Sequence, residues 1–406
     1  MGLKKKVGVV FIVLAVAAVC ELLATIMLGR YLPADEFGKF KFIHTIVLMC
    51  SALLLFGQNT AIFRVIRKNN FGRYAWRRFV FQCLAFSAII GFCVVFAVGR
   101  FYNLEKEILF IFFAFLCAVG VELLSAILRA DEQYSRSILV TKFNAILFFI
   151  SIVVLFLFFQ PHDLNLILYF YIGVFLCSLL FGIFSTRTIE SGKEDFPLKA
   201  IKEGGWLFLI AISYSFLIQI DQFFIAKMMG YEELAGYVAI ISVTRGFELL
   251  AVALRFVLVP RYSQEPNRSI RADTLKACMA AAGLVVLYVI GGKFLLHVFF
   301  KGKFDHVAGL LNFFMAIGFF RVVYTIPAGM IDGRVSSRFL RLFFVGCLMG
   351  VVLHMAGDFI LIPLFGLQGA ATSALVAWVF RIGIAYTIVY KEKRERLTDI
   401  NPQMSY

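Results

Sequence analysis

The sequence contains few charged residues and no long polar segment. Of its 406 residues, 16% are Asp, Glu, Lys or Arg and 61% are hydrophobic, and the mean hydropathy is +0.89. Soluble globular domains carry about 25% charged and about 45–50% apolar residues. The shortage of charge therefore excludes a water-soluble globular protein and indicates a protein that lies in a membrane.

Metal-ligand patterns are also missing. The chain has eight Cys and five His, but no two cysteines have the spacing of a CxxC ligand pair, and the histidines are scattered. Every cysteine falls within an apolar stretch or at its edge, where a free thiol behaves as a small apolar side chain. We therefore expect core-filling cysteines and no metal site.

What the chain does contain is a series of long apolar runs. A helix of about 20 apolar residues crosses the hydrocarbon layer of a bilayer, which is about 30 Å thick. About twelve runs of that length predict an all-α polytopic membrane protein with about 12 transmembrane helices. The expected spans are 7–28, 40–58, 79–99, 107–128, 138–159, 166–186, 206–228, 234–258, 274–298, 307–329, 342–362 and 368–390.

Lys and Arg are distributed unevenly between the segments that connect these spans. If the N-terminus is cytoplasmic, most of the 40 Lys and Arg residues fall in cytoplasmic segments, with dense groups at 4–6, 64–78 and 391–396. The positive-inside rule then places both termini in the cytoplasm, which requires an even number of spans. The net charge of +15 is accordingly a signal of membrane orientation, and no nucleic-acid partner is expected.

Short patterns recur in the two halves of the chain. Asp35 and Gly38 stand in the first outside loop, and Glu233 and Gly236 stand at the same spacing in the loop after the seventh span. Such echoes indicate an internal duplication, in which two bundles have the same topological sense. We therefore expect two six-helix lobes. Their boundaries are expected at 1–195 and 196–406.

Three parts of the sequence resemble a known family. They are Leu28–Gly38, Ser213–Asp221 with Gly230–Tyr237, and Ile362–Ala371, which reads Ile-Pro-Leu-Phe-Gly-Leu-Gln-Gly-Ala-Ala. The chain is similar to the polysaccharide biosynthesis flippases, the O-antigen and capsule repeat-unit exporters of the multidrug/oligosaccharidyl-lipid/polysaccharide exporter superfamily. The resemblance implies two lobes around a central cavity and alternating access. It also implies that a polyprenyl-pyrophosphate-linked oligosaccharide moves from the cytoplasmic to the periplasmic leaflet.

The same resemblance implies the cellular setting. The protein would be multi-pass in the bacterial cytoplasmic (inner) membrane, with cytoplasmic N- and C-termini. It would serve the assembly of a surface polysaccharide such as the O-antigen of lipopolysaccharide. Its expected partners are the lipid-linked oligosaccharide, membrane lipids and other polysaccharide assembly proteins. No cofactor is expected, and H⁺ or Na⁺ is expected as a coupling ion.

Three arginines lie near the middle of expected spans, where a charge costs about 2.5–3.5 kcal/mol even on a lenient insertion scale. Arg245, Arg321 and Arg381 are therefore expected to face a bundle interior or a water-filled cavity. Guanidinium groups bind phosphate oxygens in bidentate fashion and keep their proton, so the three form a candidate site for the lipid pyrophosphate. The alternative is neutralisation within the protein. Glu248 is three residues from Arg245, and Asp358 could pair across helices with either of the other two arginines.

Acidic residues also fall inside expected spans. A carboxyl group in a low-dielectric environment can exchange a proton or bind Na⁺, which is how an antiporter couples transport to a gradient. Asp221 lies in the polar run 219–222 and is the first choice for this role. The alternative is a structural polar link between helices, or a counter-ion for an arginine. The candidates for cation coupling are Asp221, Glu21, Glu122 and Asp358.

Two other functions fit parts of the sequence. A cation-coupled multidrug exporter of the related branch would share the fold, but the arginines of the second half favour an anionic amphiphile. A membrane polysaccharide polymerase or glycosyltransferase would hold its reactive acidic or basic residues in a sizeable extracytoplasmic loop. The expected outside loops have only about 5–12 residues, as simple helix connections do. We therefore predict a transporter and not an enzyme.

Overall fold

The computed structural model describes residues 3–58, 62, 74–159, 163–194, 198–264, 270–334 and 337–400. Within these ranges the structure is helical, apart from connecting turns and one isolated β-bridge between Tyr74 and Glu194. Residues 64–73 of the basic group expected in the cytoplasm lie outside the described residues.

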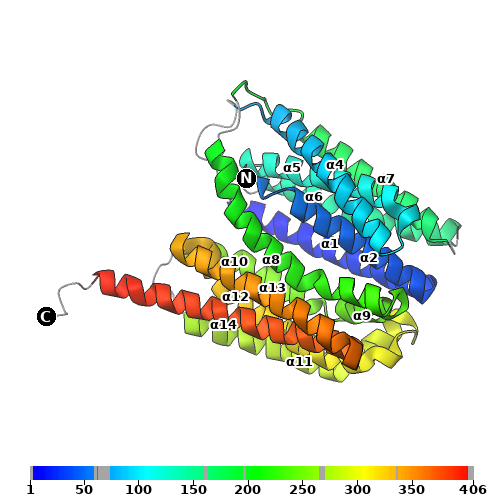
Figure 1. Cartoon of the computed structure of the whole chain (residues 1–406). Coiled ribbons are helices and arrows are strands. Elements are labelled where there is room, and N and C mark those ends of the chain that lie inside the picture. Colours follow the sequence, from blue (N-terminus) through cyan, green and yellow to red (C-terminus); the bar gives the residue numbers. More distant parts are fainter. Residues whose placement is uncertain are drawn as a thin grey trace. The chain divides into compact units, whose positions relative to one another are not determined.

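The chain divides into two compact units, Met1–Ser215 and Phe216–Tyr406. The division falls within one long helix, beyond the boundary expected at 195/196, and each unit can be followed by its colours in Figure 1. The helices of the first unit are α1 (Leu3–Tyr31), α2 (Ala34–Leu54), α4 (Trp76–Phe101), η2 (Glu105–Glu107), α5 (Ile108–Ala130), α6 (Tyr134–Phe158) and α7 (Leu164–Thr186). The dividing helix is α8 (Leu198–Met228). The second unit continues with α9 (Tyr231–Val243), α10 (Gly246–Gln264), α11 (Ile270–Phe300), η3 (Asp305–Leu310), α12 (Leu311–Arg334), α13 (Ser337–Phe365) and α14 (Leu367–Ile400).

The helices follow the expected spans in order. Among the described residues, ten helices are long and apolar enough to cross a membrane, or up to eleven if a bent pair counts as one span. α8 lies where the seventh span is expected and is not among the ten, and several of its side chains lie outside the described residues. The prediction of an all-α polytopic membrane protein is confirmed.

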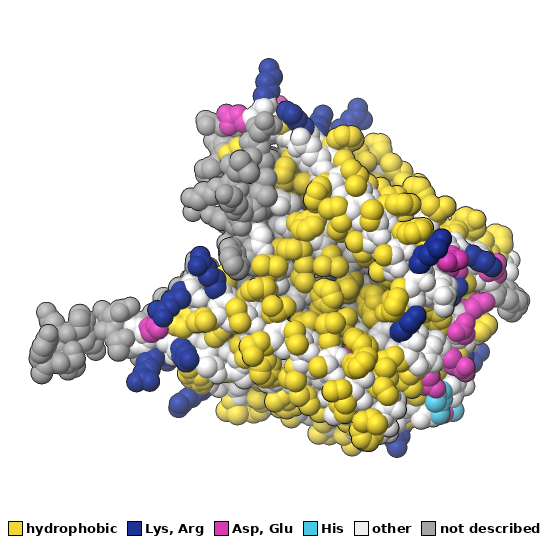
Figure 2. Space-filling model, in the orientation of Figure 1, with side chains coloured by type: hydrophobic (Ala, Val, Ile, Leu, Met, Phe, Trp, Pro, Cys, Tyr) yellow, Lys and Arg dark blue, Asp and Glu magenta, His cyan; other side chains and the backbone are white. Residues whose placement is uncertain are grey.

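The surface carries the apolar side chains that a lipid environment requires. Figure 2 shows hydrophobic groups along the length of the helices, with Lys and Arg gathered near the helix ends. Large side chains such as Ile290, Phe184 and Phe81 are 79%, 71% and 72% exposed. Exposure of this kind is unfavourable in water but favourable against lipid tails, so the surface agrees with a multi-pass membrane protein.

The core of the first unit forms around α5. This helix packs against α2, α4, α6 and α7, and most of its side chains are buried because it is apolar on nearly every side. Gly91 of α4 faces α5, where a Cβ at this position would stand 2.3 Å from the ring of Phe115. The close contact between α4 and α5 therefore depends on a glycine.

Polar groups of the first unit join helices to one another. Nζ of Lys39 in α2 lies 2.7 Å from Oε1 of Glu107 in η2. Nδ1 of His44 in α2 lies 2.7 Å from the hydroxyl of Tyr171 in α7. Each of these polar groups has a partner on a different element, so burial leaves them satisfied.

The core of the second unit forms around α12. This helix packs against α10, α11 and α14, and α13 packs along α14. Gly318 of α12 lies against Phe247 of α10, where a Cβ would stand 2.5 Å from the ring. Three helices of this unit therefore meet along α12, which places its polar side chains in the interior.

The expected span 234–258 is not one unbroken helix, because it is divided between two helices that pass the length and hydropathy test together. α9 ends at Val243, α10 starts at Gly246, and the two are bent by 51°. The backbone N–H of Gly246 donates to the hydroxyl of Tyr288 in α11 at 3.3 Å, which takes a donor out of the helical ladder. The Thr244 hydroxyl also donates back to the carbonyl of Ile240 at 3.1 Å. A side chain inserted beside a glycine is a known cause of helix kinks.

Candidate functional site

The second unit encloses a cavity of about 70 Å³, which we call the arginine cavity. Its walls come from α8, from the α9–α10 break, and from α12 and α14. The break matters for this geometry because it turns the chain beside the cavity, at Thr244 and Arg245. The lining residues are Leu217, Ile218, Asp221, Ile241, Thr244, Arg245, Phe247, Glu248, Phe314, Ile317, Gly318, Arg321, Ala374 and Trp378.

Two of the three predicted arginines line this cavity together. Arg245 comes from the break between α9 and α10, and Arg321 comes from α12. Nη2 of Arg321 lies 3.4 Å from Oε1 of Glu248, and its guanidinium lies 6.0 Å from the ring centroid of Trp378. The counter-ion expected for Arg245 therefore contacts Arg321. A cation over an indole face and beside a carboxylate is stabilised by both.

The third arginine lies behind the cavity wall. Arg381 of α14 is 2% exposed and does not line the arginine cavity. Its guanidinium lies 5.2 Å from the ring of Tyr324 and 5.9 Å from the ring of Phe343. Tyr324 in turn packs edge-on against Trp378 at 5.6 Å. Arg381 is therefore connected to the cavity lining through Tyr324 and Trp378.

Asp221 is the acidic residue of α8 that lines the arginine cavity. Its Oδ1 accepts a hydrogen bond from the backbone N–H of Gln222 at 2.8 Å, and its Oδ2 accepts one from the hydroxyl of Tyr237. Tyr237 of α9 is fully buried and packs edge-on against Phe314 of α12 at 5.1 Å. The carboxyl group is thus held in place by two donors, one of which sequence reasoning missed.

Asp358 lies deeper in the same unit beside a histidine. His354 and Asp358 are four residues apart on α13, both are 0% exposed, and Nε2 lies 3.6 Å from Oδ2. The pairing of Asp358 with Arg321 or Arg381, which the sequence left open, is not the arrangement observed. The Ser373 hydroxyl donates to the backbone carbonyl of His354 at 2.8 Å, and Ser373 also interacts with the Asp358 carboxyl group. The Asp358 carboxyl also interacts electrostatically with Asp221.

The remaining two acidic candidates lie in the first unit. Glu21 of α1 is half-buried, and its backbone carbonyl accepts a hydrogen bond from the hydroxyl of Thr25 at 2.8 Å. Glu122 of α5 is also half-buried. Within the second unit, the structure brings Asp221 into the lining of the cavity that Arg245 and Arg321 share, and Asp358 does not line it. Within the described ranges, no group of three or more His, Cys, Asp or Glu could hold a metal ion.

Two residues that the sequence analysis missed, His354 and Trp378, could have been found from their spacing to a predicted site residue. His354 precedes Asp358 by one helical turn inside an expected span, which puts both on one face. Trp378 precedes Arg381 by three residues and so also shares its face of α14. The hydroxyl of Tyr237 had no such signal, because its bond to Asp221 depends on how α8 and α9 meet.

Comparisons with known proteins identify a matching family and similar folds. A family model described as "Polysaccharide biosynthesis protein" matches residues 3–265. No curated protein matches the sequence. An inward-facing multidrug resistance MATE family transporter of the MOP superfamily is similar over 96% of each chain, with a TM-score of 0.67 and 14% identity.

Two further solved structures share the architecture. The lipid II flippase MurJ, in an inward closed conformation, is similar over 93% of this chain and 87% of its own, with a TM-score of 0.69 and 12% identity. A MOP superfamily transporter from Pyrococcus furiosus is similar over 94% of each chain, with a TM-score of 0.65 and 14% identity. At these identities the likeness establishes the fold.

Proposed function

The chain belongs to the polysaccharide biosynthesis protein family, and from this membership we propose that it is a flippase for a lipid-linked oligosaccharide. The proposed substrate is a polyprenyl-pyrophosphate-linked oligosaccharide. It moves by alternating access from the cytoplasmic to the periplasmic leaflet of a bacterial inner membrane, for assembly of a surface polysaccharide such as an O-antigen. A fold shared with a protein named as a lipid II flippase supports this proposal.

The arginine cavity is the observation that carries the substrate class. Arg245 and Arg321 line one small space inside a membrane protein, where a charge is costly unless it has a use or a partner. Guanidinium groups bind phosphate oxygens in bidentate fashion. In the proposed cycle the pyrophosphate replaces Glu248, whose Oε1 lies 3.4 Å from Nη2 of Arg321, as the anionic partner of this arginine.

We further propose that a cation gradient drives the cycle through acidic residues. Asp221 is the first choice, because it lines the same cavity as Arg245 and Arg321. A change in the charge of its carboxyl group would therefore change the electrostatic energy of both arginines. Asp358 is the second, because it interacts with Asp221 and lies beside His354. Glu21 and Glu122 are the candidates in the first unit. Either H⁺ or Na⁺ would serve as the coupling ion.

A cation-coupled multidrug exporter is the second candidate function. A similar structure is that of a multidrug resistance MATE family transporter, with a TM-score of 0.67. The substrate of such an exporter would have to fit a cavity that contains two arginines, which favours anionic compounds. Other polysaccharide assembly proteins and membrane lipids are the proposed partners under the flippase function.

The test is transport by the purified full chain in proteoliposomes. Vesicles are prepared with a fluorescent polyprenyl-pyrophosphate glycan, and an impermeant glycosidase added outside reports the fraction of glycan that reaches the outer leaflet. We expect this fraction to rise faster than in protein-free vesicles. A glycan that moves no faster than in protein-free vesicles, together with uptake of a drug dye by the same preparation, would establish the multidrug function instead.

A further inference from the structure

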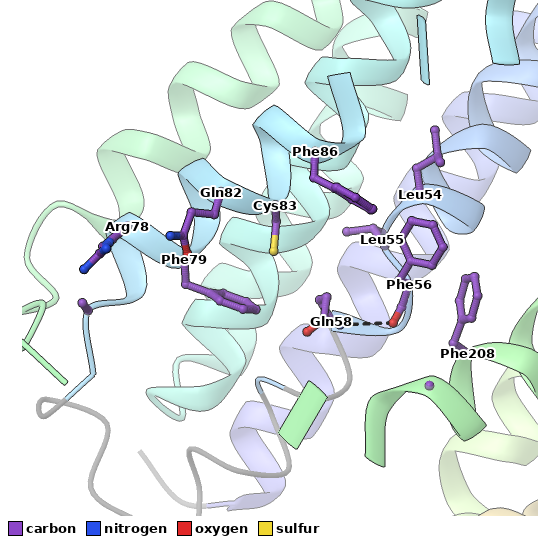
Figure 3. A pocket seen from close by; sticks show the side chains of 12 residues that line it. Leu54, Leu55, Phe56, Gln58, Arg78, Phe79, Gln82, Cys83, Phe86 and Phe208 are labelled. Atoms are coloured by element: carbon purple, nitrogen blue, oxygen red, sulfur yellow. Dashed lines mark hydrogen bonds between the residues drawn. The ribbon is translucent and has the colours of Figure 1, made fainter. Parts of the chain in front are cut away.

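The first unit contains a second cavity, which we call the apolar pocket. Its volume is about 590 Å³, which is in the range of about 300–1,000 Å³ that holds a drug-sized molecule. Its walls come from the end of α2, the turn that follows, the start of α4, and α8 (Figure 3). The lining residues are Leu54, Leu55, Phe56, Gln58, Ala75, Arg78, Phe79, Gln82, Cys83, Phe86, Gly205 and Phe208.

The pocket has an aromatic end and a polar end. Phe56 packs against Phe86 at 5.6 Å and against Phe208 at 5.2 Å, so that three elements contribute one aromatic wall. Arg78 and Gln82 lie at the other end in Figure 3. A space that is apolar along most of its wall and cationic at one end complements an anionic amphiphile.

A polar group in the wall completes this complementarity. Nε2 of Gln58 donates to the carbonyl of Phe56 at 3.4 Å, while its Oε1 is buried and accepts no hydrogen bond among the described residues. Buried acceptors of this kind are costly unless a donor reaches them. A ligand with hydroxyl groups near its anionic end would supply that donor.

The turn that forms the aromatic wall is conformationally unusual. Phe56 has a φ of 44° and Gly57 a φ of 68°, which are left-handed values. Such values are uncommon for a bulky residue, and strained residues of this kind concentrate at ligand sites. The turn brings the ring of Phe56 against Phe86 and Phe208, so the strained conformation helps to build the pocket wall.

The pocket lies at one end of the helices of the first unit. It includes the C-terminal end of α2 and the N-terminal end of α4, which the Lys and Arg distribution assigns to the cytoplasmic side. The cytoplasmic leaflet holds anionic lipids, and a juxtamembrane arginine attracts them. The ligand that is most abundant at this position is therefore a phospholipid of that leaflet.

We propose that the apolar pocket binds one acyl chain of an anionic glycerophospholipid with a hydroxyl-bearing headgroup, such as phosphatidylglycerol. The acyl chain lies along Phe56, Phe86 and Phe208. The phosphate lies at Arg78, whose guanidinium carries five donors, and a headgroup hydroxyl donates to Oε1 of Gln58. The apolar pocket shares no lining residue with the arginine cavity, so this site is separate from the proposed pyrophosphate site.

The test uses the full chain in nanodiscs with a phosphatidylglycerol that carries a photoactivatable group in its acyl chain. After irradiation, mass spectrometry maps the labelled peptides. We expect labelling to concentrate at 54–58 and 79–86, and unlabelled phosphatidylglycerol to compete about fivefold better than phosphatidylcholine, the preference that one arginine near the membrane surface gives.

Two pairs of variants separate this site from general lipid contact. Arg78→Gln should remove the preference for the anionic lipid, whereas Arg77→Gln should keep it. Arg77 is also exposed on α4, but it lies over the ring of Trp76 at 5.4 Å and does not line the pocket. Cys83→Trp should fill the pocket and abolish labelling, whereas Cys93→Trp, at an exposed position of the same helix, should not.

Two outcomes would overturn the proposal. The first is labelling spread evenly over the exposed surface of α4, at Phe81 as much as at Cys83. The second is a polyprenyl phosphate that competes better than phosphatidylglycerol, which would assign the pocket to the tail of the transport substrate. Neither outcome depends on whether the protein moves a glycan across the membrane.

Discussion

In each unit, a helix that starts with two acidic residues leads to a cavity. α2 has Asp35 and Glu36 in its first turn and ends at the turn that lines the apolar pocket. α9 has Glu232 and Glu233 in its first turn and ends at the break that lines the arginine cavity. The helix starts are alike, but the first cavity is mostly apolar with one arginine, whereas two arginines, Asp221 and Glu248 line the second. The place of a cavity therefore depends on where a helix stops, and its chemistry depends on the side chains at that stop.

The two units also treat buried charge differently. In the first unit, Glu107 has Lys39 as a close partner at 2.7 Å. In the second unit, the Arg321–Glu248 contact is longer, at 3.4 Å, and Nε2 of His354 lies 3.6 Å from Oδ2 of Asp358. Tight pairing is typical of a structural role, and loosely paired charges in a membrane mark functional sites. The proposed function assigns the transport chemistry to the second unit, where Arg245 and Arg321 line one cavity.

The largest test of this contrast removes the arginines of the cavity. Arg245→Ala combined with Arg321→Ala should lower glycan transport about 100-fold, because two charge-assisted contacts to phosphate are lost. The initial rate in the glycosidase assay measures the effect. Arg100→Ala is the control, because Arg100 is an exposed arginine of the first unit beside Glu105. An equal loss in the control would show that the chain needs its total positive charge and not the arginine cavity.

The next effect concerns energy coupling. Asp358→Asn should keep the fold, because it replaces a fully buried carboxyl group with a neutral side chain of the same shape. Transport with an imposed pH or Na⁺ gradient should then equal transport without one. Glu122→Gln, the counterpart in the first unit, should preserve the gradient dependence. The opposite pattern in the two variants would move coupling to the first unit.

A smaller effect compares one tyrosine from each unit. Tyr237→Phe removes the donor to Asp221 and should lower the free energy of unfolding by about 1–3 kcal/mol, because a buried carboxyl loses a partner. Tyr171→Phe removes the contact with His44 and should cost about 0.5–1.5 kcal/mol. Denaturant unfolding in detergent measures both. A larger loss of stability for Tyr171→Phe than for Tyr237→Phe would contradict the expectation that the Tyr237–Asp221 hydrogen bond contributes more than the Tyr171–His44 contact.

The smallest effect lies in the loop before η3. Burial lowers the pKa of Lys303, and the nearby charge of Glu232 partly offsets this by raising it. Glu232→Gln should therefore lower the pKa of Lys303 further, since an opposite charge favours the protonated amine. The pH dependence of amine labelling at Lys303 measures this, with exposed Lys301 as internal reference. A pKa of Lys303 that rises in the variant would contradict the stated interaction.

The helices were predictable because hydropathy alone locates them. Each expected span has a helix at its position, except 234–258, which is divided between α9 and α10, since a helix pairs all backbone groups of an apolar segment within a bilayer. The break at Thr244 was not predictable, because it needs the hydroxyl of Tyr288 from another helix. A Thr beside a Gly inside an apolar run is too weak a signal by itself.

The sequence identified charged residues of the candidate site, but it did not identify which of them contact one another. Depth along the span singled out Arg245, Arg321 and Arg381, but the direction in which each faces depends on helix rotation. That rotation places Arg321 in the cavity wall and Arg381 behind it, between Tyr324 and Phe343. Partners on other helices, such as Glu248 for Arg321, depend on the same packing.

The break between α9 and α10 has an electrostatic consequence of its own. In a continuous helix the peptide dipoles run through to the two ends, whereas a break creates a new pair of helix ends, each with about half an elementary charge. The N-terminus of α10 begins at Gly246, directly after Arg245, and its first turn contributes Phe247 and Glu248 to the cavity lining. Ile241 and Thr244, at the C-terminal end of α9, line the same cavity. The break therefore brings the positive end of α10 and the negative end of α9 to the arginine cavity, and this pair of helix ends would persist if both arginines were replaced.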